Sequence, residues 1–306
     1  MLSSRMFKGK TKHPRQFTTL LSRELFMQIR KAVITAAAQD QTHLPLQTVV
    51  DQSGHSRNAI ELILDEVVAA GIDDIGVVVC PGQADRYLAA AGPHASRLTF
   101  LTQENPKGYG DAILRAEAFT AGQPFLHLVG DHLYVSRDPE KGCVAQLLEI
   151  AQREECCVSA IQPTRESKLR YYGAIGGTPV PRHPGLYEVT TVVEKPTPTT
   201  AEQQLVVAGQ RSGYYLCLFG MHVLTPAIMQ LLKSAVDSFQ VGRSINLTDS
   251  LNQLVKTERF LAFQVRGERY NIGEKYGLLI AQMAIALSGP DRDRILVETM
   301  ELLARD

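Results

Sequence analysis

Short apolar runs alternate with amphipathic helical stretches over the first half of this chain, and this alternation limits the fold more than any other feature. The run from Ala32 to Ala36 is followed by a polar loop and then by apolar side chains at helical spacing up to Gly71. Apolar strands between helices are typical of a parallel sheet covered on both faces. The elements expected in this half are strands at 32–36, 75–80, 98–102 and 125–129, and helices at 58–70, 83–91 and 110–119.

The second half has shorter strands and a less regular order. It predicts strands at 156–162, 172–177, 187–193, 213–219 and 260–265, and helices at 142–153, 225–234, 247–256, 274–287 and 291–304. We therefore expect an α/β, Rossmann-like fold whose mixed, mostly parallel central sheet is flanked by helices. Composition changes nowhere within residues 31–306, so we expect one domain there.

Residues 1–30 differ from the rest in charge. Seven basic side chains are opposed only by Glu24. We interpret this segment as a solvated N-terminal extension, with a transit peptide or an anion-binding arm as alternatives. The seven are Arg5, Lys8, Lys10, Lys12, Arg15, Arg23 and Arg30.

Composition excludes several classes of protein. The chain has 44% hydrophobic residues, enough for a large core, but no apolar run near the roughly 20 residues of a membrane helix. A formal net charge of zero argues against a nucleic-acid-binding face. Five cysteines without metal-ligand spacing favour a reducing cytoplasm. We expect a cytoplasmic protein that binds neither membrane nor nucleic acid, while a small anionic substrate remains compatible.

Three motifs follow strands that should end at one edge of the sheet, where ligands of open α/β sheets bind. Gly108 and Gly110 precede a helix and would let backbone N–H groups approach a base or phosphate, although taken alone they fit a tight turn with an N-cap aspartate better. Asp131 follows an apolar strand and suits Mg²⁺, or caps a turn. Glu194 and Lys195 offer an acceptor for sugar hydroxyls and a cation for phosphate, or form a surface ion pair.

Together these residues give the chain from about 31 to 287 a resemblance to the sugar-1-phosphate nucleotidyltransferases, most closely the bacterial UTP–glucose-1-phosphate uridylyltransferases. The resemblance lies in the order of many short segments. They include Ala32-Val33-Ile34, Gln103 with Gly108-Tyr109-Gly110-Asp111-Ala112, Gly130-Asp131, Tyr172-Gly173, Val193-Glu194-Lys195-Pro196, Leu247-Thr248-Asp249 and Tyr270-Asn271-Ile272-Gly273-Glu274.

The resemblance implies a role for each matching position. The nucleotide would be bound by Ala37, Ala38, Gln103, Gly108 and Asp131, with Gln103 and the Gly108 backbone at the uracil edge. The sugar phosphate would be bound by Gly173, Glu194 and Lys195, and the Mg²⁺ cofactor by Asp131 and Asn271. Asp131 and Lys195 would be the catalytic residues.

One loop departs from the family pattern G-x-G-T-R, which is followed by a proline and a P-K pair. Ala38 to Pro45 occupy its place, so both glycines are missing, Thr42 stands for the arginine and Asp40 adds a negative charge. The family's lysine after this loop has no counterpart. Asn271 replaces an aspartate of the metal site, and a neutral amide binds Mg²⁺ more weakly than a carboxylate does.

Two hypotheses follow. The first is a nucleotidyltransferase-family protein that binds a uridine nucleotide or UDP-sugar with little or no catalysis and regulates an active paralogue. The second is an active uridylyltransferase with a rebuilt triphosphate site, which joins UTP and a sugar 1-phosphate such as glucose 1-phosphate. A third hypothesis, a nicotinamide dehydrogenase, is poorly supported because no G-x-G-x-x-G follows the first strand. The relatives also lead us to expect a homo-oligomer.

Overall fold

The computed structural model describes residues 27–304. Most of the basic extension expected at 1–30 therefore lies outside the described residues. Within the described part, every helix is too short or too polar to span a bilayer, and Cys80, Cys143, Cys156, Cys157 and Cys217 are free thiols.

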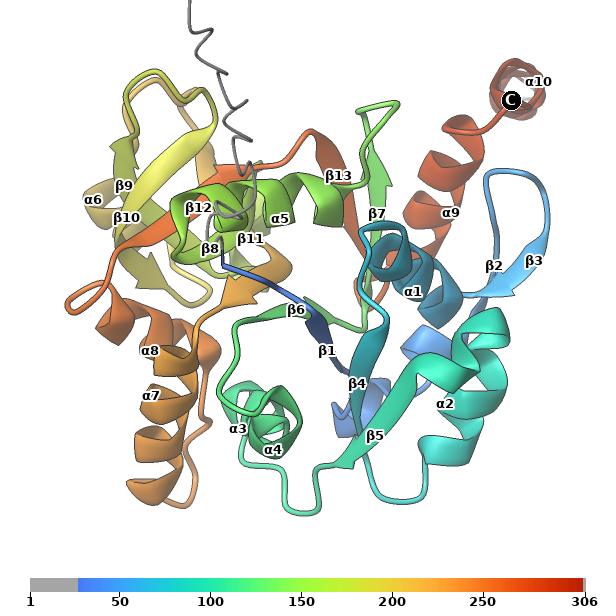
Figure 1. The fold of residues 1–306 in the computed structure, drawn as a ribbon. Coiled ribbons are helices and arrows are strands. Elements are labelled where there is room, and N and C mark those ends of the chain that lie inside the picture. Colours follow the sequence, from blue (N-terminus) through green and yellow to red (C-terminus); the bar gives the residue numbers. More distant parts are fainter. Residues whose placement is uncertain (1–26, 305–306) are drawn as a thin grey trace, which may run out of the picture.

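A nine-stranded sheet runs through both halves of the chain in the order β5-β4-β1-β6-β11-β8-β12-β10-β9 (Figure 1). Its strands are β1 (Lys31–Thr35), β4 (Asp74–Val79), β5 (Leu98–Thr102), β6 (Phe125–Val129), β8 (Cys157–Arg165), β9 (Ala174–Pro179), β10 (Leu186–Val193), β11 (Tyr214–Leu224) and β12 (Phe260–Gln264). Two small antiparallel sheets pair β2 (Thr48–Val50) with β3 (Ser56–Asn58), and β7 (His132–Ser136) with β13 (Gly267–Asn271).

The sheet is mixed, as expected, but it is not mostly parallel, because the second half contains mainly antiparallel pairs. The pairings among β5, β4, β1 and β6 are all parallel, as predicted. Beyond them β11 pairs antiparallel with β6, β8 and β9, and only β8 with β12 is parallel. The β11–β9 pairing also closes β11, β8, β12, β10 and β9 into a ring. β8, β9 and β10 follow one another without an α-helix between them, which permits antiparallel neighbours such as β9 and β10.

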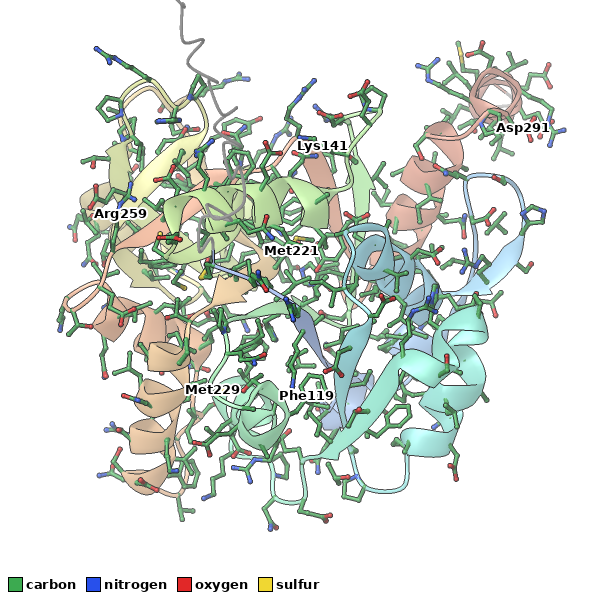
Figure 2. The ribbon with its side chains drawn as sticks, in the orientation of Figure 1. Phe119, Lys141, Met221, Met229, Arg259 and Asp291 are labelled. Atoms are coloured by element: carbon green, nitrogen blue, oxygen red, sulfur yellow. The ribbon has the colours of Figure 1, made fainter. Side chains whose placement is uncertain are left out.

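Helices cover both faces of the sheet (Figure 1). Along β1, Ala32 and Ile34 join one hydrophobic cluster with α1 and α5, whereas Val33 joins a second cluster with α3, α7 and α8. Met221 of β11 lies deep in the first cluster (Figure 2). The helices are α1 (Ala59–Ala69), α2 (Ala84–Ala90), α3 (Tyr109–Leu114), α4 (Glu117–Thr120), α5 (Cys143–Glu154), α6 (Pro198–Gln204), α7 (Pro226–Asp237), α8 (Leu247–Leu254), α9 (Gly277–Leu287) and α10 (Arg292–Leu303).

Two details of the sequence prediction change. The single helix expected at 110–119 is divided into α3 and α4. The polar loop expected from Gln39 to Ser56 contains 3₁₀ turns at Gln39–Gln41 and Leu44–Leu46 and the strand β2. Such short elements depend on packing rather than on a periodic pattern, since Leu44, Pro45 and Val49 are buried.

Candidate functional site

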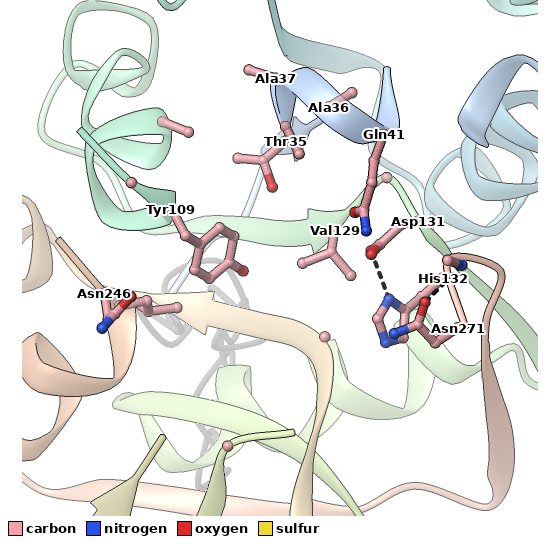
Figure 3. A pocket seen from close by; sticks show the side chains of 18 of the residues that line it. Thr35, Ala36, Ala37, Gln41, Tyr109, Val129, Asp131, His132, Asn246 and Asn271 are labelled. Carbon is pink, nitrogen blue, oxygen red and sulfur yellow. Dashed lines mark hydrogen bonds and ion pairs between the residues drawn. The ribbon is translucent and has the colours of Figure 1, made fainter. Parts of the chain in front are cut away.

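A cavity of about 870 Å³ lies where the chain leaves β1, β5 and β6 (Figure 3). These strands are parallel, so the segments that follow them meet at one edge of the sheet. The structure brings all nine predicted site residues to the wall of this cavity, while their roles stay predictions. They are Ala37, Ala38, Gln103, Gly108, Asp131, Gly173, Glu194, Lys195 and Asn271.

Asp131 emerges directly after β6 and is held by its neighbour. Its Oδ1 lies 2.7 Å from Nδ1 of His132, whose ring is almost fully buried. Burial acts to raise the pKa of Asp131, but the charge and hydrogen bond of His132 and the charge of Lys195 outweigh it and hold this pKa below its usual range. Asp131 is therefore an ionised carboxylate at neutral pH.

Asn271 ends β13 opposite His132, and the Ile272 N–H donates to the Asp131 carbonyl at 2.9 Å. The side-chain oxygen of Asn271 accepts a hydrogen bond of 2.8 Å from the Gly273 N–H. Within residues 27–304 no group of three or more His, Cys, Asp or Glu side chains forms a metal cluster. Mg²⁺ sites commonly combine one or two carboxylates with substrate phosphates, so Asp131 would serve as one carboxylate ligand, and the Asn271 amide oxygen, already engaged by Gly273, would be a weaker one.

Gln103 is buried, and its side-chain amide organises the loop that follows β5. Nε2 donates to Asp111 Oδ2 at 2.7 Å and to the Gly108 carbonyl at 3.2 Å. The opposite Asp111 oxygen, Oδ1, accepts from Arg115 at 2.7 Å. The Gln103 N–H groups therefore shape the predicted base-binding loop before any ligand enters.

Gly108 has a role that local sequence did not reveal. Its φ of +123° suits glycine, and a Cβ there would lie 2.4 Å from Ser244 Oγ and 2.7 Å from the Ile245 backbone. The Gly110 N–H donates to the Ile245 carbonyl at 2.8 Å, so it is not available to a phosphate. The glycines permit close packing of residues 244–245, and Gly108 also lines the cavity.

The opposite wall carries the predicted sugar-phosphate residues. Glu194 Oε2 accepts a hydrogen bond of 2.6 Å from Thr248 Oγ1, and a Cβ on Gly173 would lie 3.1 Å from the same oxygen. Lys195 has a left-handed backbone with φ of +43° and extends from Glu194 with its side chain 58% exposed. Backbone strain of this kind costs of order 1 kcal/mol and is common at functional sites.

The loop after β1 supplies no cation to the cavity. The side chain of Gln41 points toward Asp131 (Figure 3). The residues of this loop that line the cavity are Ala36, Ala37, Ala38, Gln39, Asp40, Gln41 and Pro45. Thr42, which takes the arginine's place in the sequence, is not among the lining residues. Its carbonyl accepts a hydrogen bond of 3.0 Å from the buried Tyr87 hydroxyl instead.

Among the described residues, four carboxylates and two permanent cations line the cavity. The carboxylates are Asp40, Asp131, Glu194 and Glu274, and the cations are Arg170 and Lys195. Glu274 is further engaged by Lys168 at 2.8 Å and by the Tyr172 hydroxyl. Excess negative charge opposes a triphosphate more than a diphosphate.

Some lining residues carried no assigned role in the sequence. Thr248, Arg170 and Glu274 come from segments distant along the chain. In the sequence, only the family resemblance of the segments that contain them indicated Thr248 and Glu274. No local signal marked Arg170.

Tyr109 and His222 also line the cavity, above a buried row of polar groups. The Tyr109 hydroxyl lies 3.4 Å from Nδ1 of His127, whose Nε2 is 3.2 Å from Thr35 Oγ1. Burial, with a smaller contribution from His222, lowers the pKa of His127 well below its usual range, and burial lowers the pKa of His222 to about 3. Both imidazoles are therefore neutral hydrogen-bonding groups.

Comparison with known proteins identifies the family of this chain. Residues 49–286 match the family described as nucleotidyl transferase. The chain is 29% identical to the UTP–glucose-1-phosphate uridylyltransferase of Streptococcus pneumoniae over 86% of this chain and 92% of that protein. It is 30% identical to UTP–glucose-1-phosphate uridylyltransferase 1 of Streptococcus pyogenes, over 86% of this chain and 90% of that protein.

Solved structures support the fold. A UDP-glucose pyrophosphorylase complexed with UDP-glucose has a TM-score of 0.69 and 24% identity, with 84% of this chain and 98% of that chain covered. A UTP-bound protein of this type from Acinetobacter baumannii has a TM-score of 0.68 and 22% identity, with 91% and 99% covered.

Proposed function

This chain belongs to the nucleotidyl transferase family, and we propose that its cavity binds a uridine nucleotide, preferentially a UDP-sugar, with nucleotidyl transfer slow or absent. The relatives that span most of the chain are UTP–glucose-1-phosphate uridylyltransferases. The convergence of nine predicted residues on one cavity supports a ligand of the same class.

The proposed ligand divides along the cavity. The base lies against Gln103 and Gly108, in a loop already fixed by Asp111. The sugar lies beside Gly173 and Glu194, where a side chain on Gly173 would crowd the carboxylate. The phosphates lie between these ends, near Asp131 and Lys195. Mg²⁺ bound with the nucleotide would neutralise phosphate charge there.

The charge of the cavity is the observation that carries the proposal of weak transfer. Phosphoryl transfer is accelerated mainly by positioned cations, and one arginine supplies about 10³ to 10⁵ in rate. The loop after β1 supplies none and adds Asp40. A UDP-sugar carries one phosphate fewer than UTP and so needs less neutralisation. A silent binder of this kind would act as a sensor or as a regulator of an active paralogue.

An active uridylyltransferase is the second candidate, and two observations favour it. Asp131 is kept ionised by its surroundings, and Lys195 retains a strained backbone that a residue without function would not need. In that reaction a phosphate oxygen of the sugar 1-phosphate would attack the α-phosphorus of UTP. The bond to the β-phosphate oxygen would break, and pyrophosphate would leave. Lys195 would hold the sugar phosphate for this attack.

Pyrophosphate release separates the two candidates. Purified protein is incubated with UTP, glucose 1-phosphate and Mg²⁺, and UDP-glucose binding is measured by calorimetry on the same sample. UDP-glucose binding without turnover is the expected result. Turnover that Asp131→Ala abolishes would establish the enzyme, and absence of both signals would contradict the uridine-sugar assignment.

A further inference from the structure

Arg269, in the middle of β13, is a buried cation that is hydrogen-bonded only to neutral groups. It is 7% exposed, and burial lowers the pKa of its guanidinium. Its Nη1 donates to Gln162 Oε1 at 3.0 Å and its Nη2 to Thr164 Oγ1 at 3.4 Å, while its Nε has no hydrogen-bond partner within residues 27–304. Arginine stays protonated in proteins, and a buried charge is costly unless an opposite charge pairs with it. Stability alone therefore does not account for this side chain.

The guanidinium of Arg269 stacks on the ring of Tyr172. Its central carbon lies 3.8 Å from the ring centroid of Tyr172 and 5.9 Å from that of Phe219. Cation–π contacts are strongest where the cation is desolvated, as it is here. The two hydrogen bonds to β8 fix the plane of the guanidinium, so Arg269 holds the Tyr172 ring in one position.

Tyr172 connects this buried cation to the cavity. It lines the cavity and directly precedes Gly173, beside which we place the sugar. Its hydroxyl donates to Glu274 Oε1, and its ring lies edge-on to the ring of His132, with the centroids 6.2 Å apart. Both of these neighbours also line the cavity. One aromatic ring thus contacts Arg269 on one side and two residues of the cavity wall on the other.

We propose that Arg269 is a positioning residue for the sugar end of the ligand and acts through the ring of Tyr172. The proposal rests on the proposed UDP-sugar ligand. Arg269 does not line the cavity, so it acts on the ligand only through a neighbour. Without the guanidinium, the Tyr172 ring loses the stack that fixes it beside Gly173. Asp131 keeps its own hydrogen bond to His132 (Figure 3), so the phosphate end is affected less.

Calorimetric titration with UDP and with UDP-glucose, both in Mg²⁺, tests the proposal. Arg269→Met keeps an unbranched side chain and removes the guanidinium. We expect UDP-glucose affinity to fall about tenfold and UDP affinity to stay within about twofold of the wild type. An equal loss for the two ligands, or no loss for either, would overturn the proposal.

Arg211→Met is the matched control for the loss of a stacked cation. The Arg211 guanidinium lies 5.4 Å from the ring centroid of Tyr214, and neither residue lines the cavity. This variant should bind both ligands as the wild type does.

A double-mutant cycle tests whether Arg269 acts through Tyr172. Tyr172→Leu alone should reduce the ratio of UDP-glucose to UDP affinity, and adding Arg269→Met should reduce it no further. Additive losses would contradict action through the ring. If circular dichroism shows that Arg269→Met does not fold, Arg269→Lys takes its place, because lysine keeps the charge and lacks the plane that stacks on the ring. An unchanged affinity ratio in Arg269→Lys would then overturn the proposal.

A measurement without ligand separates this proposal from the proposed function. In protein labelled with fluorotyrosine, Tyr172→Phe identifies the fluorine resonance of Tyr172, and Arg269→Met should shift that resonance. An unchanged resonance would overturn the positioning role of Arg269. Wild-type protein that binds neither UDP nor UDP-glucose would instead contradict the proposed function.

Discussion

Thr248 donates a hydrogen bond of 2.6 Å from its hydroxyl to Glu194 Oε2, joining α8 to the segment after β10. The two residues are 54 positions apart in the sequence. This bond fixes the carboxylate that we assign to sugar hydroxyls. Helix α8 therefore helps to determine where the sugar would lie.

Removal of this bond should weaken UDP-glucose binding without unfolding the protein. Thr248→Val keeps the side-chain shape and frees Glu194 to rotate, so we expect affinity to fall about five- to tenfold in calorimetry. Thr257→Val is the control and should bind normally, because Thr257 lies three residues beyond the end of the same helix, outside the cavity, and its hydroxyl donates to the Leu254 carbonyl at 3.2 Å. Unchanged affinity in Thr248→Val would remove Glu194 from the sugar site.

A side chain at Gly108 should disrupt the base-binding loop. Gly108→Ala places a Cβ 2.7 Å from the Ile245 backbone, and we expect the unfolding free energy to fall by about 2 to 4 kcal/mol. We also expect this variant to lose nucleotide binding. Gly54 has φ of +87° with nothing within 4 Å, so Gly54→Ala reports backbone strain alone, about 1 kcal/mol. Equal losses in the two variants would show that the contact with Ile245 is unimportant.

Replacement of Lys195 should stabilise the fold and weaken ligand binding. Lys195→Gly relieves the left-handed backbone, so the free energy of unfolding measured in urea should rise by up to about 1 kcal/mol. UDP-glucose affinity should fall about tenfold, because the cation is lost. Glu155, at φ of +51° after α5, is the matched control, because Glu155→Gly should raise stability and leave binding intact. Intact binding in Lys195→Gly would exclude Lys195 from the phosphate site.

The Asp131 carboxylate should contribute pH-dependent stability. Its folded-state pKa lies below the unfolded value, so the contribution is complete above the unfolded pKa and is lost as pH falls through the folded one. Asp131→Asn mimics the protonated form. The unfolding free energies of the wild type and Asp131→Asn, measured in urea at pH 7, 5 and 3, should therefore become more similar as the pH falls. A difference between them that does not change with pH would contradict the lowered pKa of Asp131.

The sequence predicted which residues line one cavity better than it predicted the strand directions of the sheet. Apolar runs identified β1, β4, β5 and β6, and the residues after β1, β5 and β6 could be placed at one edge because parallel strands share it. The antiparallel second half was missed, since strand direction depends on contacts distant in sequence, such as β11 with β6.

Within the site, the predicted residues converge, but their supports could not be foreseen. Nothing near Gly108 in the sequence indicates Ile245, 137 positions away by residue number, although Ile245 accounts for the glycine. Thr42 corresponds to the family's arginine only by its position in the sequence, and in the structure it does not line the cavity. Alignment by motif gives position along the chain, whereas the direction of a side chain depends on the packing around it.

Calorimetric titration of the wild-type protein with UDP-glucose and with UTP, both in Mg²⁺, tests the proposed ligand preference most directly. The negative cavity predicts that UDP-glucose binds about tenfold or more tightly than UTP, and that Asp40→Asn narrows the difference while the remote Asp85→Asn does not. UTP binding as tight as UDP-glucose binding, or tighter, would contradict the account and favour an active uridylyltransferase.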